Sequence, residues 1–200
     1  MTIRPRLVVA TRNPGKAREI AAALPEVQVC ALESYPDLKM PDEVGETFLE
    51  NARIKASYVA DALGAAAVLA DDSGLEVEYL GGRPGVRSAR WREGTDADRS
   101  DAILRALDGV EPVRRGARFV CAMIFCGFGS PVGVEGVCEG RISTEPRGDR
   151  GFGYDPIFEL PDGRTMAELH PEEKNRISHR GKALSKILPL LRQHFGWARD

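Results

Sequence analysis

The sequence lacks the features of a membrane protein, of a nucleic-acid-binding protein and of a disulfide-rich protein. No run approaches the roughly 20 apolar residues of a membrane span, and the apolar run near the N-terminus is too short for a signal peptide. Lys and Arg number 28 against 30 for Asp and Glu, so a basic excess is missing. The four cysteines form no CxxC pair, which favours buried, reduced thiols over disulfides or zinc. We expect a cytosolic, cytoplasmic protein that binds no membrane and no polymeric nucleic acid.

The length of 200 residues suits one folding unit, and we expect residues 1–200 to form a single domain. Periodicity and turn residues predict strands at 6–10, 27–32, 67–70, 75–79, 118–125 and 132–138, the last two as a hairpin joined by GFGS. They predict helices from the loop TRNPGK to about 24, and at 47–63, 95–107 and 179–195. Because helices and strands interleave early and a hairpin comes later, the fold class is α/β with a mixed sheet flanked by helices.

The first candidate site is the motif TRNPGK between an expected strand and an expected helix. A strand-to-helix turn presents free backbone N–H groups and the positive end of the helix dipole. Lys16 adds a full charge, Thr11 a hydroxyl and Asn13 an amide, and these groups suit a polyphosphate. An ordinary Asn-Pro-Gly turn is an equally good interpretation, and the motif is not a Walker A loop.

Two adjacent carboxylates, Asp71 and Asp72, follow a short buried strand and precede Ser73-Gly74. Ligands of open α/β sheets lie beyond the carboxyl ends of strands. Neighbouring carboxylates repel each other unless a cation or hydrogen bonds offset their charge. Because adjacent residues of an extended chain point oppositely, we expect one carboxylate to face the site and the other to hold the loop. A capped turn is the structural alternative.

Charged residues also gather around the start of the expected helix 47–63. Asp42 and Glu43 lie in the preceding loop, and Lys55 lies within the helix. Acids near a helix start are favoured by the dipole alone, and Thr47 with Glu50 fits a capping box. A structural interpretation of Glu50 therefore stands beside a functional one.

The segment GGRPGVRSARWR is rich in arginine and contains no acid. Its arginines are Arg83, Arg87, Arg90 and Arg92. Solvated arginines are the ordinary interpretation. Their concentration beside glycines, which let backbone approach a ligand, favours anion binding or a subunit interface.

Two later motifs offer groups for recognising a flat base. In GFGYDPIF, Phe152 or Tyr154 would be free to stack on a base, whereas Phe158 is expected in the core. In EEKNRISHRGK, His179 and Arg180 at a helix start offer directional donors. Basic phosphate-binding groups together with a carboxylate cluster imply a metal-bound polyphosphate. Magnesium, which takes one or two carboxylates plus substrate phosphates, is the predicted cofactor.

Together these motifs resemble those of the inosine/xanthosine triphosphate pyrophosphatase family, which cleans the nucleotide pool. TRNPGK is similar to the family's opening T/S-x-N-x-x-K, and ETFLENARIKA, ADDSGLEV, LGGRPGVRSAR, GFGYDPIF and EEKNRISHRGKAL follow in family order. The resemblance covers about residues 6–195. It implies an elongated α/β fold whose two lobes flank a cleft, usually as a homodimer.

The resemblance also implies the role of each motif. Asp72 would be the catalytic carboxylate, and Glu43 and Asp72 would hold magnesium, with Asp42 as the alternative to Glu43. Arg12 stands where glycine is frequent and Trp91 where Tyr or Phe is common. The substrate-binding residues that the resemblance implies are, for the triphosphate, Thr11, Arg12, Asn13, Pro14, Gly15, Lys16 and Lys55, with Ser73 beside the substrate, and, for the base, Phe152, Gly153, Tyr154, Asp155, Lys174, His179 and Arg180.

These assignments predict hydrolysis of ITP, dITP and XTP to the monophosphate and pyrophosphate by in-line attack of water on the α-phosphorus. Magnesium and basic side chains would offset phosphate charge, and Asp72 would accept the proton of the water. The alternatives are a related house-cleaning pyrophosphatase for other modified nucleotides and a non-catalytic nucleotide-sensing module. A shared task for Lys174, His179 and Arg180 favours purines, and the intact carboxylates argue against a sensor.

Overall fold

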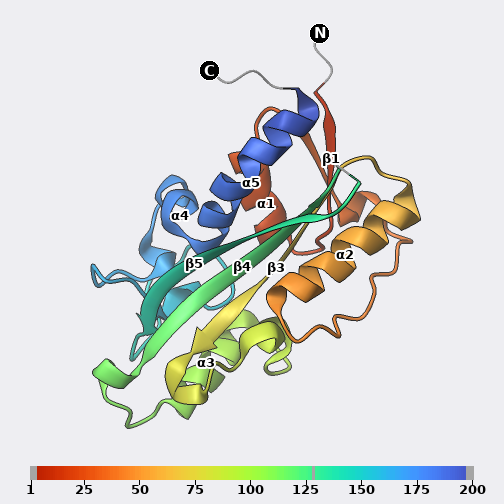
Figure 1. Ribbon diagram of the computed structural model, residues 1–200. Helices are drawn as coiled ribbons and strands as arrows, with labels where there is room; N and C mark the ends of the chain where they lie inside the picture. The colour runs from red at the N-terminus through yellow and green to blue at the C-terminus, as the bar shows by residue number, and fades with distance from the viewer. Residues whose placement is uncertain (1–3, 128, 197–200) are drawn as a thin grey trace. The chain divides into compact units, whose positions relative to one another are not determined.

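The computed structural model describes residues 4–127 and 129–196 (Figure 1). Helices and strands alternate in the first half, as predicted. None of the described helices combines the length and apolar character that crossing a membrane requires. The elements in chain order are β1 (Arg6–Val9), α1 (Pro14–Ala23), β2 (Gln28–Ala31), α2 (Phe48–Leu63), β3 (Val68–Val77), α3 (Asp96–Ala106), β4 (Gly116–Cys126), β5 (Val132–Ile142), β6 (Phe158–Glu159), α4 (Pro171–Ile177) and α5 (His179–Phe195).

The six strands form one mixed sheet in the order β2-β1-β3-β4-β5-β6. β1 pairs in parallel with both β2 and β3, so that Val8 lies opposite Cys30 on one side and Val68 on the other. β5 pairs antiparallel with β6. Because only five residues join β4 to β5, too few for a parallel crossover, this pair is the predicted hairpin. The expected GFGS turn contains Phe128, which lies outside the described residues.

The described chain forms two compact units, and it passes from one unit to the other within the long strands β3, β4 and β5. Unit 1 comprises Met1–Asp72, Cys121–Gly136 and Gly181–Asp200, and unit 2 comprises Ser73–Val120 and Val137–Arg180. Each unit has its own apolar cluster. The two lobes expected from the family resemblance agree with this division, and the peptide bond between Asp72 and Ser73 is one of the places where the chain passes from one unit to the other.

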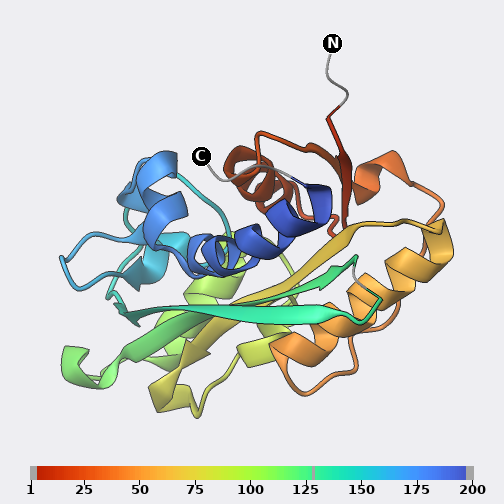
Figure 2. The same cartoon turned by 45° about the horizontal axis from the view of Figure 1, so that its top comes forward.

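Unit 1 packs helices on both faces of its strands. Alternate strand residues such as Val9, Leu69 and Met123 share one cluster with α1 and α5. The neighbouring residue Ile124 faces the other side, where it and Leu49 of α2 both approach Gly133. Figures 1 and 2 show α1 and α5 on one side of these strands and α2 on the other. The two-residue period of a strand thus assigns each strand side chain to one helix layer.

The ends of α2 follow the predicted signals. Thr47 accepts a hydrogen bond from Glu50 N, and the Glu50 carboxylate accepts in return from Thr47 N. Gly64 closes the helix with a φ of 55°, in the left-handed region that glycine adopts without strain. Glu50 is therefore a capping residue, which confirms the structural interpretation.

Unit 2 is held by an apolar cluster and by the buried guanidinium of Arg115. Leu75, Val77 and Phe158 belong to the cluster, which confirms the core position of Phe158. The guanidinium of Arg115 donates to Leu107 O at 2.9 Å, and also to two carbonyls at the end of β5 and just after it. These bonds tie the end of α3 to the end of β5.

One predicted boundary is wrong: the chain does not turn at Asp71–Gly74. β3 runs without a break from Val68 to Val77. This strand lies between β1 and β4, but β1 pairs with it only at Val68 and Leu69. Beyond Leu69, pairing with the neighbouring strand β4 outweighs the turn preference of Asp-Ser-Gly. Tyr79 lies beyond the strand in a short 3₁₀ turn and is 44% exposed.

Candidate active site

Asp71 and Asp72 are buried in β3 and face opposite helix layers. The Asp71 carboxylate lies 3.2 Å from Lys16 Nζ of α1, and the Asp72 carboxylate lies 2.8 Å from Lys55 Nζ of α2. The expectation that adjacent carboxylates point oppositely is confirmed. The expectation that one of them holds a loop is wrong, because both lie in a continuous strand and each pairs with a lysine.

Lys55 joins two carboxylates from different segments. Its Nζ donates to Glu43 Oε1 at 2.9 Å and to Asp72 Oδ1 at 2.8 Å. Burial works to lower the pKa of Lys55, but the surrounding carboxylates outweigh it and raise that pKa above its ordinary value. Burial also raises the pKa of Asp72, and the lysines only partly oppose this effect. The lysine therefore stays charged, whereas ionisation of Asp72 is costly.

The carboxylates beside Lys55 fit a magnesium ion. Asp72 Oδ2 is buried and has no hydrogen-bond partner among residues 4–127 and 129–196. A buried acceptor of this kind calls for a cation or a proton. Glu43 contacts the same ammonium group, whereas Asp42 is exposed. In the described part of the chain no group of three or more His, Cys, Asp or Glu side chains is placed to hold an ion. One or two carboxylates completed by phosphates is the coordination that magnesium commonly adopts.

The loop that carries Glu43 is held by Asn51, a residue to which the sequence assigned no role. Asn51 is fully buried on α2, where its side chain accepts from Gly45 N at 2.8 Å and donates to Gly45 O at 3.4 Å. A Cβ on Gly45 would lie 2.8 Å from the Asn51 oxygen, so this approach requires glycine. An amide on the apolar face of the predicted helix was the signal that could have revealed it.

The TRNPGK turn is satisfied largely by its own side chains. Asn13 Oδ1 accepts from Gly15 N at 2.8 Å and from Lys16 N at 3.1 Å, and Thr11 Oγ1 accepts from Asn13 N. The expected free N–H groups are therefore capped at Gly15 and Lys16, since Asn13 is the N-cap of α1. Arg12 donates to the carbonyl of Leu38. The turn also carries the Lys16 ammonium, which lies 3.2 Å from the Asp71 carboxylate.

In unit 2, Asp155 organises the predicted base-binding loop, residues 151–155. Its Oδ2 accepts from Phe152 N at 2.8 Å and lies 2.6 Å from Lys174 Nζ. Gly151 has a φ of 79°, and a Cβ there would lie 2.1 Å from the same oxygen. Glycine at 151 thus allows the carboxylate to close over the loop. Asp155 and Lys174 are both buried.

Phe152 lies beside two cations. Lys174 Nζ is 4.8 Å and Arg180 Cζ 5.6 Å from the ring centroid. Arg180 is only 2% exposed and donates to Ser73 Oγ at 2.9 Å, and the His179 ring stacks on Phe119 with centroids 4.6 Å apart. The structure thus brings Ser73, Phe152, Lys174 and Arg180 together within unit 2.

Tyr154 corrects one expectation. It is buried in the apolar cluster of unit 2, and its hydroxyl donates to Ser88 O at 2.8 Å. Burial raises the pKa of this phenol above its ordinary value. Tyr154 is therefore a core residue that is not free to stack on a base, and Phe152, which is half-buried, is the aromatic residue left for that task.

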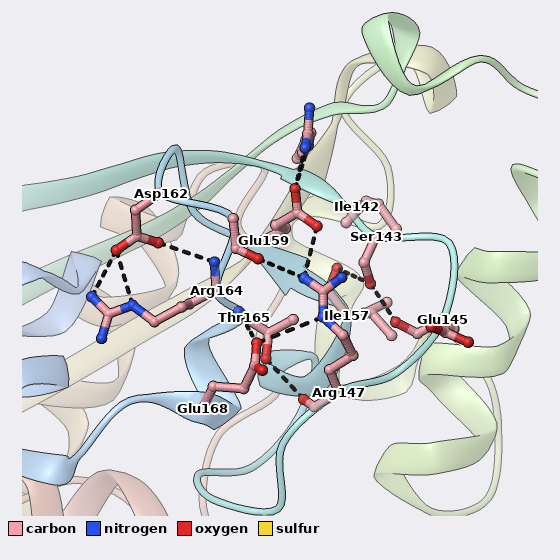
Figure 3. A network of polar contacts seen from close by, with 12 residues as sticks. Ile142, Ser143, Glu145, Arg147, Ile157, Glu159, Asp162, Arg164, Thr165 and Glu168 are labelled. Atoms are coloured by element: carbon pink, nitrogen blue, oxygen red, sulfur yellow. Dashed lines mark hydrogen bonds and ion pairs between the residues drawn. The ribbon is translucent and has the colours of Figure 1, made fainter.

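A polar network fixes the chain just before residue 151 (Figure 3). Arg147 donates to Glu159 Oε2 at 2.8 Å and to Gly163 O at 2.7 Å. Thr165 Oγ1 donates back to Arg147 O, and Thr165 N donates to Glu168. The network ties the segment that leads into the base-binding loop to β6 and to the chain that follows it.

The whole chain can be compared with known proteins. A family model described as the Ham1 family matches residues 7–190. The chain belongs to the Ham1 family. It is 51% identical to the dITP/XTP pyrophosphatase of Geobacillus kaustophilus, over 90% of this chain and 91% of that protein. It is 45% identical to the dITP/XTP pyrophosphatase of Streptomyces avermitilis, over 96% and 99%. The solved structure of a HAM1 protein from Coxiella burnetii superposes with a TM-score of 0.84 at 40% identity, over 94% and 99%.

The match to the Ham1 family spans every residue expected to bind substrate or metal, from Thr11 to Arg180. It also spans the arginine-rich segment. Arg83, Arg87, Arg90 and Arg92 are all exposed, and the Arg83 guanidinium lies 6.0 Å from the Trp91 ring centroid. Exposure agrees with the solvated interpretation of these arginines, and anion binding or a subunit interface stays a prediction.

Proposed function

We propose that this Ham1-family chain hydrolyses deaminated purine nucleoside triphosphates, ITP, dITP and XTP, to the monophosphate and pyrophosphate. Identities of 45–51% to relatives named dITP/XTP pyrophosphatase, over at least 90% of this chain, support the substrate class. The observation that carries the chemistry is Asp72, a buried carboxylate with one bonded and one unpartnered oxygen beside a charged lysine.

Asp72 serves in this proposal as the acceptor of the proton that water loses as it attacks the α-phosphorus. Burial raises its pKa, which strengthens the carboxylate as a base once it is ionised. Lys55 already holds one Asp72 oxygen, so the carboxylate keeps its orientation while the other oxygen stays available. Lys16 and Lys55 supply positive charge toward the phosphates, which offsets the charge that develops on the leaving pyrophosphate.

We propose Mg²⁺ as the cofactor, with Glu43 and Asp72 as its protein ligands. The ion would neutralise negative charge on the phosphate oxygens. Asn51 would keep the Glu43 loop in place through Gly45, and Lys55 holds the two carboxylates close together. Because the protein supplies few ligands, substrate phosphates would complete the coordination.

The residues of unit 2 would select the base. Phe152 presents an aromatic face for stacking, and Lys174, His179 and Arg180 supply donors. Inosine and xanthosine carry a 6-oxo group, whereas adenosine carries a 6-amino group that would oppose a donor at the same position. A buried donor left unpaired by the wrong base is a large penalty, so adenosine triphosphate would be rejected strongly. Guanosine triphosphate shares the 6-oxo group and would be rejected less completely.

The family resemblance supports three further proposals: that residues 1–200 act as one catalytic domain, that the chain forms a homodimer, and that it works in the cytoplasm. Light scattering on the purified chain measures the oligomeric state directly. A monomer at all concentrations tested would contradict the dimer without touching the proposed chemistry.

A panel of nucleoside triphosphates tests the proposed function. Pyrophosphate release should be fastest with ITP, dITP and XTP, slower with GTP and much slower with ATP. Chelation of the metal should abolish release, and excess magnesium should restore it. Equal rates with ITP and ATP, or release of orthophosphate in place of pyrophosphate, would contradict the proposal.

A further inference from the structure

The loop 151–155 is fastened to the first turns of α3, a helix to which no role in the reaction has been assigned. Asp96 Oδ2 accepts a hydrogen bond of 2.7 Å from Gly153 N. Ser100 Oγ donates a hydrogen bond of 3.4 Å to Gly153 O. Two side chains of one helix therefore hold both backbone polar groups of a single loop residue.

The local sequence of α3 explains how both side chains reach the same residue. Asp96 and Ser100 are four residues apart, so they lie one above the other on one helix face. Thr95 caps the helix, and Asp98 completes a capping box that fixes the first turn. Arg99 donates to the second oxygen of Asp96 and so leaves Oδ2 directed at the loop. Ser100 is buried, whereas Asp96 is half-exposed.

Gly153 is the position where the loop needs this support. Its φ of 65° lies in the left-handed region, and it separates Phe152 from the buried Tyr154. Tyr154 is anchored through Ser88 on one side. On the other side, Phe152 N donates a hydrogen bond to the Asp155 carboxylate. The two hydrogen bonds to Gly153 therefore hold the backbone directly after Phe152.

We propose that Asp96 is a positioning residue for base recognition, which holds Gly153 so that Phe152 keeps its place against Lys174 and Arg180. The inference rests on the proposed function, because that function gives Phe152 the task of stacking on the base. Asp96 touches neither the base nor the phosphates. Its effect passes through one backbone hydrogen bond, supported by Ser100.

A purely structural role for Asp96 makes a different prediction. An acid in the first turn of a helix is stabilised by the helix dipole, and this effect depends on charge. Asp96→Asn removes the charge but keeps an oxygen that can accept from Gly153 N, whereas Asp96→Ala removes both. Loop positioning predicts that the asparagine variant resembles wild type. A dipole effect predicts that it resembles the alanine variant.

Binding measurements separate the base from the phosphates. Asp96→Ala should weaken binding of inosine monophosphate about three- to tenfold, the range expected for one lost hydrogen bond. It should leave binding of tripolyphosphate with magnesium unchanged, and its loss in kcat/KM for ITP should lie in KM. Asp96→Asn should bind inosine monophosphate as wild type does. Asp101→Ala, an exposed acid on the same helix, is the matched control.

Hydrogen exchange measures the bond itself. The Gly153 amide should exchange faster in Asp96→Ala than in wild type or Asp96→Asn, while the thermal midpoint stays within a few degrees. Unchanged inosine monophosphate binding in Asp96→Ala, or equal weakening of both ligands, overturns the inference and leaves the proposed function standing. A wild-type chain that binds no inosine monophosphate and releases no pyrophosphate from ITP overturns both.

Discussion

Two buried lysine–aspartate pairs occupy the two units, and they differ in what the aspartate still has to offer. In unit 1, Lys55 lies 2.8 Å from Asp72, and in unit 2, Lys174 lies 2.6 Å from Asp155. Lys55 divides its hydrogen bonds between two carboxylates, and Asp72 Oδ2 has no hydrogen-bond partner within the described ranges. One Asp155 oxygen, by contrast, accepts from both Lys174 and the Phe152 backbone.

The N···O distances of the two ion pairs are therefore similar although the two aspartates have different roles. Asp72 Oδ2 is available to a metal or a proton, and burial raises the pKa of Asp72. Asp155 is committed to a loop and a neighbouring cation. We therefore expect the same substitution, aspartate to asparagine, to remove chemistry in one unit and structure in the other.

Asp72→Asn should produce the largest loss of activity. The amide is nearly isosteric, but it is a poor base and a poor magnesium ligand, so turnover of ITP should fall at least about 100-fold. Stability should hold, because an ionised Asp72 is costly where it lies and Lys55 keeps Glu43 as a partner. Pyrophosphate release and thermal unfolding measure the two effects. Activity within about tenfold of wild type, roughly 1.4 kcal/mol of barrier, would refute the assignment.

Asp155→Asn should act mainly on stability. The substitution removes the buried negative charge beside Lys174, and breaking a buried ion pair costs about 3–5 kcal/mol. Denaturant unfolding measures the loss. The folded fraction of this variant should also discriminate less between ITP and ATP, because the hydrogen bond from Phe152 N to residue 155 is weakened. If Asp155→Asn is as stable as wild type, the proposed difference between Asp155 and Asp72 is wrong.

Lys16→Ala should have a smaller effect, mainly on the affinity for the triphosphate. Lys16 forms the third lysine–aspartate pair, 3.2 Å from Asp71, and Asn13 already caps the neighbouring N–H groups. Removing the ammonium should weaken binding of a non-hydrolysable ITP analogue about tenfold. Arg18→Ala, an exposed cation of the same helix, serves as the control. Unchanged affinity in Lys16→Ala would return the loop to an ordinary turn.

Local signals predicted much of the fold. The capping box at Thr47 and Glu50, the glycine end of α2 and the alternation that separates Asp71 from Asp72 all depend on near neighbours in the chain. The unbroken β3 did not follow from such signals, because β1 pairs with it only at Val68 and Leu69 and its extension depends on pairing with β4, which lies far along the chain. The turn preference of Asp-Ser-Gly is a weaker effect than that pairing.

The candidate site shows the same limit. Motifs pointed to Asp155 and Lys174, but spacing does not reveal that one oxygen joins Lys174 to the Phe152 backbone. Tyr154 has the residue type of a stacking group, yet its neighbours place it in the core. Asp96 acts through the backbone of Gly153, 57 residues away in the chain, and no local signal marks such a contact. Asn51 acts through Gly45, only six residues away, and its place on the apolar face of the helix is a sequence signal.

The division of labour between the two units is tested most directly by the ratio of kcat/KM for ITP to kcat/KM for ATP. It should be measured in wild type, Asp72→Asn and Arg180→Ala at saturating magnesium. Asp72→Asn should lower both values by the same factor and leave the ratio unchanged. Arg180→Ala should lower the ITP value far more than the ATP value, because a donor to the 6-oxo group is lost. Equal losses in Arg180→Ala, or a selective loss in Asp72→Asn, would contradict the account.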